Sequence, residues 1–88
     1  MVIISKSTLN KFGNDHPESK EALSNWYQIT KNADWNNYHE LKNTFNSADT
    51  VGNDRYSFNI KGNQYRLIAL IIFDTRTLFI LFIGTHND

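Results

Sequence analysis

Cysteine is absent from the 88-residue sequence, and proline occurs only once. Without cysteine, neither a disulfide framework nor a thiolate metal site can form. Small secreted domains usually depend on such cross-links, so we expect this chain to work in a reducing compartment, the cytoplasm. Its length allows a single domain, residues 1–88. Because a domain of this size buries only about 60–65% of its unfolded surface, the core must be dense.

Long hydrophobic segments and an excess of one charge are also lacking. Met1–Ile4 is too short for a signal peptide or a membrane span, and the apolar run Leu67–Phe73 ends at Asp74, so no membrane association is expected. Nine basic and nine acidic side chains give a formal net charge of zero. Nucleic-acid-binding domains normally carry a basic surface, so such a function would have to depend on a local cluster of cations.

Common catalytic and metal-binding motifs are missing too. There is no G-x-x-x-x-G-K-[ST] phosphate loop, no G-x-G-x-x-G turn and no H-E-x-x-H pair. His16, His39 and His86 have no metal-ligand spacing, so we predict no metal site. Nothing marks an activated serine or a pair of carboxylates of the glycosidase kind.

The start of the chain combines a short apolar run with a helical pattern. Met1–Ile4 could form an edge strand. Ser7 could cap a short helix that carries Leu9 and Phe12 and is closed by Gly13-Asn14.

Two further helices are predicted before residue 50. Pro17 suits the first turn of a helix that reaches about Lys31, because its missing N–H has no partner there in any case. Asp34 could cap a short helix near residues 37–46. The apolar positions at helical spacing are Leu23, Trp26, Tyr27, Thr30, Tyr38, Leu41 and Phe45.

From Thr50 onward the apolar period changes to two. Gly62-Asn63 is a two-residue hairpin signal, Gln64–Phe73 is the returning strand, and Thr77–Ile83 follows a turn at residues 74–76. The last strand and most of its predecessor are apolar on both faces, so we expect the middle of the sheet to be covered on both sides. Helices packed on a small, mainly antiparallel sheet predict an α+β fold.

The hairpin register decides which side chains share a face. With Gly62 and Asn63 as the turn, Asn59 lies opposite Arg66. The polar face would carry Arg55, Asn59, Lys61 and Arg66, and the other face Tyr56, Phe58, Ile60, Tyr65 and Leu67. A two-residue loop at Thr75-Arg76 would bring Thr85 beside Arg66 and His86 beside Tyr65. A three-residue loop would put His86 opposite Arg66, so either loop brings His86 to the end of the sheet that holds Arg66.

Such a cluster has the chemistry needed to cleave RNA through its own 2′-hydroxyl. That reaction needs a proton acceptor, positive charge on the phosphate and a donor to the leaving oxygen. A histidine can act as acid or base, arginine offers a fork of donors to phosphate oxygens, and lysine supplies a point charge. Developing charge in the transition state would be stabilised by these groups together.

Structural explanations compete with each of these assignments. An arginine and a lysine on a strand are more often solvated surface residues, and a lone histidine near a chain end usually has no function. His16 is suited to a helix entry and His39 to a solvated helix position. Trp26 and Trp35 are better suited to a core than to stacking on bases. The residues alone therefore predict a fold and leave the function open.

Four segments resemble the HigB group of RelE-like toxins, in the same order and at the same spacing. A motif of the form kADW, an fNIkGNkYRL hairpin and an fiGTH strand recur in that group. The matching segments here are Ala33-Asp34-Trp35, Ser47-Ala48-Asp49, Arg55–Ile68 and Phe79–His86. The hairpin and the terminal Gly-Thr-His are the specific part.

The resemblance implies an mRNA interferase, a metal-independent endoribonuclease that cuts messenger RNA during translation on the ribosome without a cofactor. A HigA-like helix-turn-helix antitoxin would silence it, and operator DNA would be bound only through the pair. Attack by the 2′-hydroxyl would leave a cyclic phosphate. Arg66, His86 and Lys61 correspond to catalytic positions, and RNA binding would fall on Arg55, Asn59, Lys61 and Arg66.

The resemblance stops at the end of the printed sequence. The family strand continues beyond Gly-Thr-His into a segment resembling xEYDKI, whereas this sequence ends at Asn87-Asp88. We expect a chain that carries such a segment to cleave RNA more strongly. Two alternatives remain: a catalytically inactive RelE-like module that binds an antitoxin or the ribosome, and an unrelated interaction domain.

Overall fold

A computed structural model of the chain describes residues 1–85. Within that range, a layer of helices packs on one β-sheet. In chain order its elements are β1 (Val2–Ile4), α1 (Lys6–Asp15), the 3-10 turn η1 (Pro17–Ser19), α2 (Lys20–Lys31), α3 (Tyr38–Thr44), β2 (Asp49–Gly52), β3 (Arg55–Ile60), β4 (Tyr65–Ile72), the 3-10 turn η2 (Phe73–Thr75) and β5 (Thr77–Thr85).

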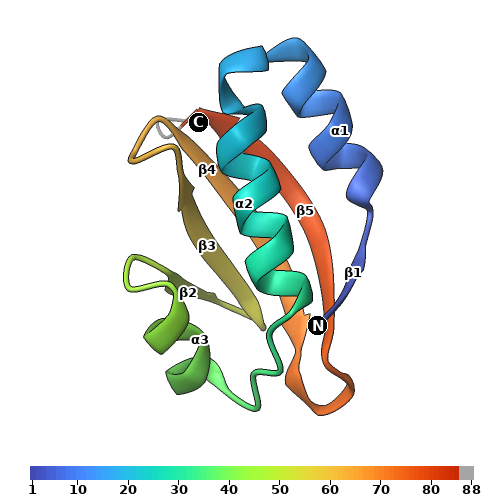
Figure 1. The fold of residues 1–88 in the computed structure, drawn as a ribbon. Coiled ribbons are helices and arrows are strands. Elements are labelled where there is room, and N and C mark those ends of the chain that lie inside the picture. The colour runs from blue at the N-terminus through green and yellow to red at the C-terminus, as the bar shows by residue number, and fades with distance from the viewer. Residues whose placement is uncertain (86–88) are drawn as a thin grey trace.

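The strands form one sheet in the order β1-β5-β4-β3-β2. Neighbouring strands are antiparallel except β1, which runs parallel to β5. Figure 1 shows α1 and α2 lying across one face of this sheet, with α3 beside β2. The predicted α+β fold, with a mainly antiparallel sheet packed by two or three helices, is confirmed, and Met1–Ile4 supplies the predicted edge strand.

The core lies between the helices and the inner face of the sheet. Trp26 of α2 packs edge-on against Phe58 of β3 at a ring distance of 5.3 Å, and Phe45 meets the same ring at 5.5 Å. Phe58, Leu67, Ile71 and Leu78 are almost fully buried. Each such side chain contributes about 1.5–3 kcal/mol through its burial. Both tryptophans are core residues, as predicted.

The outer face of the sheet, by contrast, has no helix over it within residues 1–85. We call the side of the sheet opposite the helices the outer face. On β4 and β5 it carries the side chains that alternate with the buried ones, and on β1 and β3 it carries the side chains paired with these. Val2, Ile4, Phe79 and Phe82 lie on it and are 56%, 40%, 37% and 39% exposed. The expectation that the sheet is covered on both sides is therefore wrong: every helix of the described range packs on one face, and apolar residues remain on the other.

The helix boundaries differ from the predicted ones at three places. Helix α1 begins after Ser5, so Ser7 is not its cap, and Gly13 is a buried residue inside the helix, where an added Cβ would lie 3.1 Å from the Lys20 side chain. The predicted helix from Pro17 is a 3-10 turn that continues as α2 from Lys20. Helix α3 is capped by Asn37, whose side chain accepts a hydrogen bond from the Glu40 N–H at 3.0 Å.

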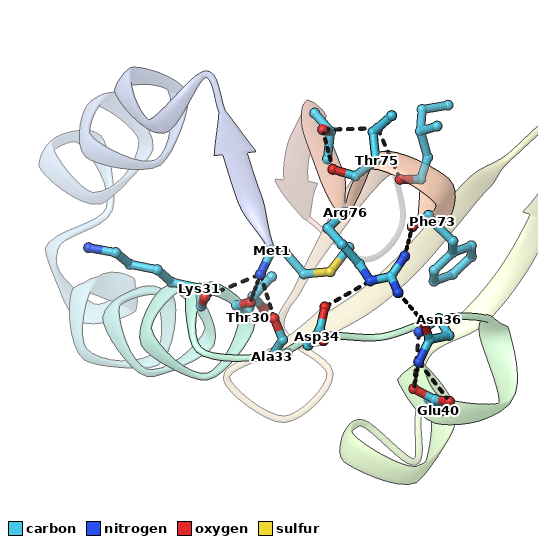
Figure 2. A network of polar contacts seen from close by, with 12 residues as sticks. Met1, Thr30, Lys31, Ala33, Asp34, Asn36, Glu40, Phe73, Thr75 and Arg76 are labelled. Atoms are coloured by element: carbon cyan, nitrogen blue, oxygen red, sulfur yellow. Dashed lines mark hydrogen bonds and ion pairs between the residues drawn. The ribbon is translucent and has the colours of Figure 1, made fainter.

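Asp34, predicted as a helix cap, instead binds a distant turn. Figure 2 shows the Arg76 side chain reaching Asp34, Asn36 and the carbonyl oxygen of Phe73. The Arg76 Nε donates to the Asp34 carboxylate at 2.8 Å. Arg76 has a left-handed backbone, with φ of 53°, and it ends the η2 turn. This network therefore closes the loop between β4 and β5.

Candidate functional site

The β3–β4 hairpin has the predicted register. Asn59 is paired with Arg66 and Ser57 with Ile68, and half-buried positions alternate with buried ones along both strands after the exposed Arg55. The turn comprises Lys61–Gln64, and the Gln64 N–H donates to the Lys61 carbonyl at 3.3 Å. The side-chain amide of Asn59 donates to the Asn63 oxygen at 2.9 Å, which holds Asn59 against the turn.

Arg66 occupies the outer face, half-buried, directly across from Asn59. Among residues 1–85, no acceptor forms a hydrogen bond or ion pair with its guanidinium, whereas Arg76 makes three such contacts. An arginine without an internal partner keeps all its donors for a ligand, and its planar fork matches the oxygens of a phosphate.

The register of β5 differs from the registers that a two-residue and a three-residue loop would give. Gly84, and neither Thr85 nor His86, is the residue opposite Arg66, and Thr85 is opposite Tyr65. There are two causes: the connection is longer, residues 73–76, with a 3-10 turn followed by the left-handed Arg76, and β5 carries one extra residue between the partners of Ile68 and Ala69. His86, the predicted general acid or base, lies outside the described residues.

Two other predicted site residues lie away from the Asn59–Arg66 pair. Lys61 has a φ of 53° in the turn, so the strand alternation that would align it with Asn59 stops at Ile60. Its exposed charge still adjoins the same end of the hairpin. Arg55 is exposed at the far end of β3, paired with Leu70, four residues from Asn59 and therefore about 13 Å along the strand.

A cluster of ionisable side chains, missed by the sequence reasoning, lies on the inner side of the same sheet end. The Tyr65 hydroxyl donates to the carboxylate of Glu18, and the His16 ring stacks on Phe12 at 4.3 Å. His16 Nδ1 lies 3.8 Å from the Glu18 carboxylate. The bond from Tyr65 lowers the pKa of Glu18, with smaller help from His16 and Lys61, and the same bond raises the pKa of Tyr65.

This cluster joins the helical layer to the strand that carries Arg66. Because Tyr65 and Arg66 are consecutive, a side chain anchored on the inner face precedes one that points to the outer face. The contact spans 47 positions in the sequence, so no local pattern could have indicated it. Neither residue type pointed to the contact, since a glutamate at a helix start and a tyrosine on a strand are both ordinary.

The groove between the first two helices lies apart from the outer face. It has a volume of about 470 Å³, is lined in part by Lys6, Lys20 and Tyr27, and belongs to the helical layer. Within residues 1–85, no group of three or more His, Asp or Glu side chains is arranged to hold a metal ion. None of the helices described there has the length and apolarity needed to cross a bilayer.

The outer face near the hairpin can thus bind a phosphate. Arg66 supplies an uncommitted fork and Asn59 a polar side chain held by the turn, while Lys61 is an exposed charge in the turn itself. Gly84, opposite Arg66, adds no side chain there. Cation donors aimed at a phosphate stabilise the negative charge that develops when it is attacked.

Comparisons with known proteins point to one family. A family model described as the HigB toxin, the RelE-like toxic component of a toxin-antitoxin system, matches residues 19–88. The chain is also 30% identical, over 90 aligned residues, to a protein named mRNA interferase HigB from Escherichia coli O6:H1. That alignment covers 100% of this chain and 87% of the relative. The chain therefore belongs to the HigB family of RelE-like toxins.

Proposed function

We propose that this chain is an endoribonuclease that cleaves messenger RNA and so inhibits translation, with its site on the outer face around Arg66. The observation that carries the proposal is an arginine without a partner among the described residues, on an uncovered sheet face, inside the most specific segment of the family pattern. The similarity to a relative named mRNA interferase supports the substrate. The zero net charge is compatible with it because Arg66 and the exposed Lys61 belong to the same end of the hairpin.

In the proposed reaction, the 2′-hydroxyl attacks the adjacent phosphorus, and its proton is taken by a base. The bond to the 5′-oxygen of the next nucleotide breaks, and that oxygen receives a proton, which leaves a 2′,3′-cyclic phosphate. Arg66 would bind the non-bridging oxygens, with Lys61 as a second charge and Asn59 and Arg55 as contacts to the RNA. His86 is our candidate for the proton transfers, and this assignment rests on the sequence alone.

A toxin of this family has an antitoxin as its partner. We further propose that the antitoxin is a HigA-like helix-turn-helix protein and that the pair binds operator DNA through the antitoxin. Cleavage on the ribosome and a cytoplasmic location follow from the same proposal, because messenger RNA is accessible there during translation.

The test is a translation reaction in which cleavage of the messenger RNA is mapped by primer extension. Arg66→Ala should lower the cleavage rate by about 10²–10³-fold, the usual effect of removing one transition-state donor. Lys11→Ala, which removes an exposed cation of α1, should cleave at the wild-type rate. Equal cleavage by a folded Arg66→Ala protein would reject the assignment of the site, and no cleavage by the wild-type protein would favour the inactive binding module.

A further inference from the structure

A β-bulge in β5 places two aromatic rings on the outer face, which the alternation of residues along the sequence does not predict. Ile68 is paired with Phe82 and Ala69 with Ile80, so Leu81 is the extra residue between them. Phe79 and Phe82 are three positions apart and would point to opposite faces of a regular strand. Because the bulge inserts one residue, both rings lie on the outer face.

These rings lie beside the proposed phosphate site. Phe82 is opposite Ile68, and Gly84 is opposite Arg66, so Phe82 and Arg66 are diagonal neighbours on one face. Diagonal neighbours in a sheet are about 7–8 Å apart, within reach of an aromatic and a long side chain. Phe79 continues the surface along β5, opposite Leu70.

The charges of the outer face match a polyanion. At its described positions on β1, β3, β4 and β5, Arg55 and Arg66 are the charged residues, and none is acidic. Asp49 lies farther out on the edge strand β2, where it is 3.4 Å from Lys42. Arg66 on the central strand β4 lies beside Phe82 of β5, and a cation next to an exposed ring is a combination by which a sheet binds single-stranded RNA.

We propose that the outer face is a base-binding surface for single-stranded RNA, on which Phe82 stacks against the base next to the phosphate held by Arg66. This inference rests on the proposed ribonuclease function and adds to it the position of the substrate bases. Phe79 extends the surface to a further base along β5. We favour RNA over a second copy of the chain because the described strands β1, β3, β4 and β5 place two arginines and no acidic residue on this face.

The test measures binding without cleavage. The probe is a short, fluorescently labelled single-stranded oligonucleotide with 2′-fluoro groups, which lacks the nucleophilic hydroxyl. Its affinity is measured by anisotropy for the wild type, Phe82→Leu, Phe82→Tyr and Ile29→Ala. Phe82→Leu keeps an apolar side chain and removes the ring, so affinity should fall about five- to hundredfold, while Phe82→Tyr should bind like the wild type. Ile29, 46% exposed on α2, is the control and should have no effect.

Each outcome decides between this surface and other occupants. Wild-type affinity in a folded Phe82→Leu protein, or no binding of the probe by the wild type, would overturn the inference. Loss of antitoxin binding by Phe82→Leu with unchanged RNA affinity would assign the face to a protein. The proposed function fails separately: the wild type would then bind the 2′-fluoro probe through Phe82 yet leave ordinary messenger RNA uncut.

Discussion

Asn59 and Arg66 lie directly opposite each other across the β3–β4 hairpin, on the face of the sheet that no described helix covers. The Asn59 amide is bound to Asn63 in the turn, whereas the Arg66 guanidinium has no acceptor within residues 1–85. The hairpin thus presents one polar group that is already held and one cation that is available. We expect the phosphate contact to depend mainly on Arg66. The shape of the turn should depend instead on Asn59 and Asn63.

Two variants at Lys61 should separate the effect of its charge on cleavage from the effect of its backbone strain on stability. Its φ of 53° disfavours a side chain, so Lys61→Gly should leave the free energy of unfolding unchanged or raise it by up to about 1 kcal/mol. Lys61→Ala removes the same charge and keeps the strain. Both variants should cleave RNA about tenfold more slowly, a smaller effect than that of Arg66→Ala because Lys61 is exposed. Urea unfolding and cleavage rates measure the two effects, and wild-type cleavage by both variants would remove Lys61 from the site.

Arg76 should contribute to stability and not to cleavage. Arg76→Ala removes three contacts that close the η2 turn, so we expect a loss of about 1–2 kcal/mol in the free energy of unfolding. Asp34→Asn should cost much less, since the Asp34 side chain is 81% exposed and an exposed ion pair contributes little. Cleavage per folded molecule should be unchanged because this turn lies at the other end of β4 from Arg66. A variant with normal stability and lost activity would contradict that separation.

The Tyr65–Glu18 bond should make stability depend on pH at both extremes. The folded pKa of Glu18 lies below its ordinary value of 4.5, so its contribution is present above that pH and is lost as the pH falls through the folded value. The folded pKa of Tyr65 lies above 10.0, so its contribution is lost as the pH rises through the folded value. The stability difference between wild type and Tyr65→Phe should therefore be constant near neutral pH and shrink on both sides.

Tyr56→Phe is the matched control for that experiment. Burial raises the pKa of Tyr56, so its removal should change the alkaline limb of the stability curve and leave the acid limb as in the wild type. Thermal unfolding followed by circular dichroism across the pH range gives both curves. An unchanged acid limb in Tyr65→Phe would show that the bond to Glu18 does not contribute in solution.

The sequence predicted the hairpin well because its signals are local. Gly62-Asn63 and the alternation of Tyr56, Phe58 and Ile60 are enough to set the pairing of Asn59 with Arg66. The partner of Arg66 on β5 could not be predicted, because two features set it together: the four-residue connection 73–76 and the extra residue at Leu81. Neither feature has a local signal as clear as Gly62-Asn63.

The bulge and the uncovered face show a second limit of sequence patterns. A run that is apolar on both faces suggests burial on both sides, yet Phe79 and Phe82 remain exposed within the described structure. Periodicity counts positions and does not reveal the extra residue at Leu81. The Glu18–Tyr65 hydrogen bond could not be predicted either, because it joins a 3-10 turn to a strand that is distant in the sequence.

The most direct measurement of the central claim is the chemistry of the ends left on cleaved messenger RNA. Mass spectrometry of products from the wild-type protein and from Arg66→Ala would define both the reaction and the residue. Our account expects 2′,3′-cyclic phosphate ends, no cut where the scissile nucleotide lacks its 2′-hydroxyl, and cleavage about 10²–10³-fold slower for Arg66→Ala. Products with 3′-hydroxyl and 5′-phosphate ends, or wild-type rates in the folded Arg66→Ala variant, would contradict it.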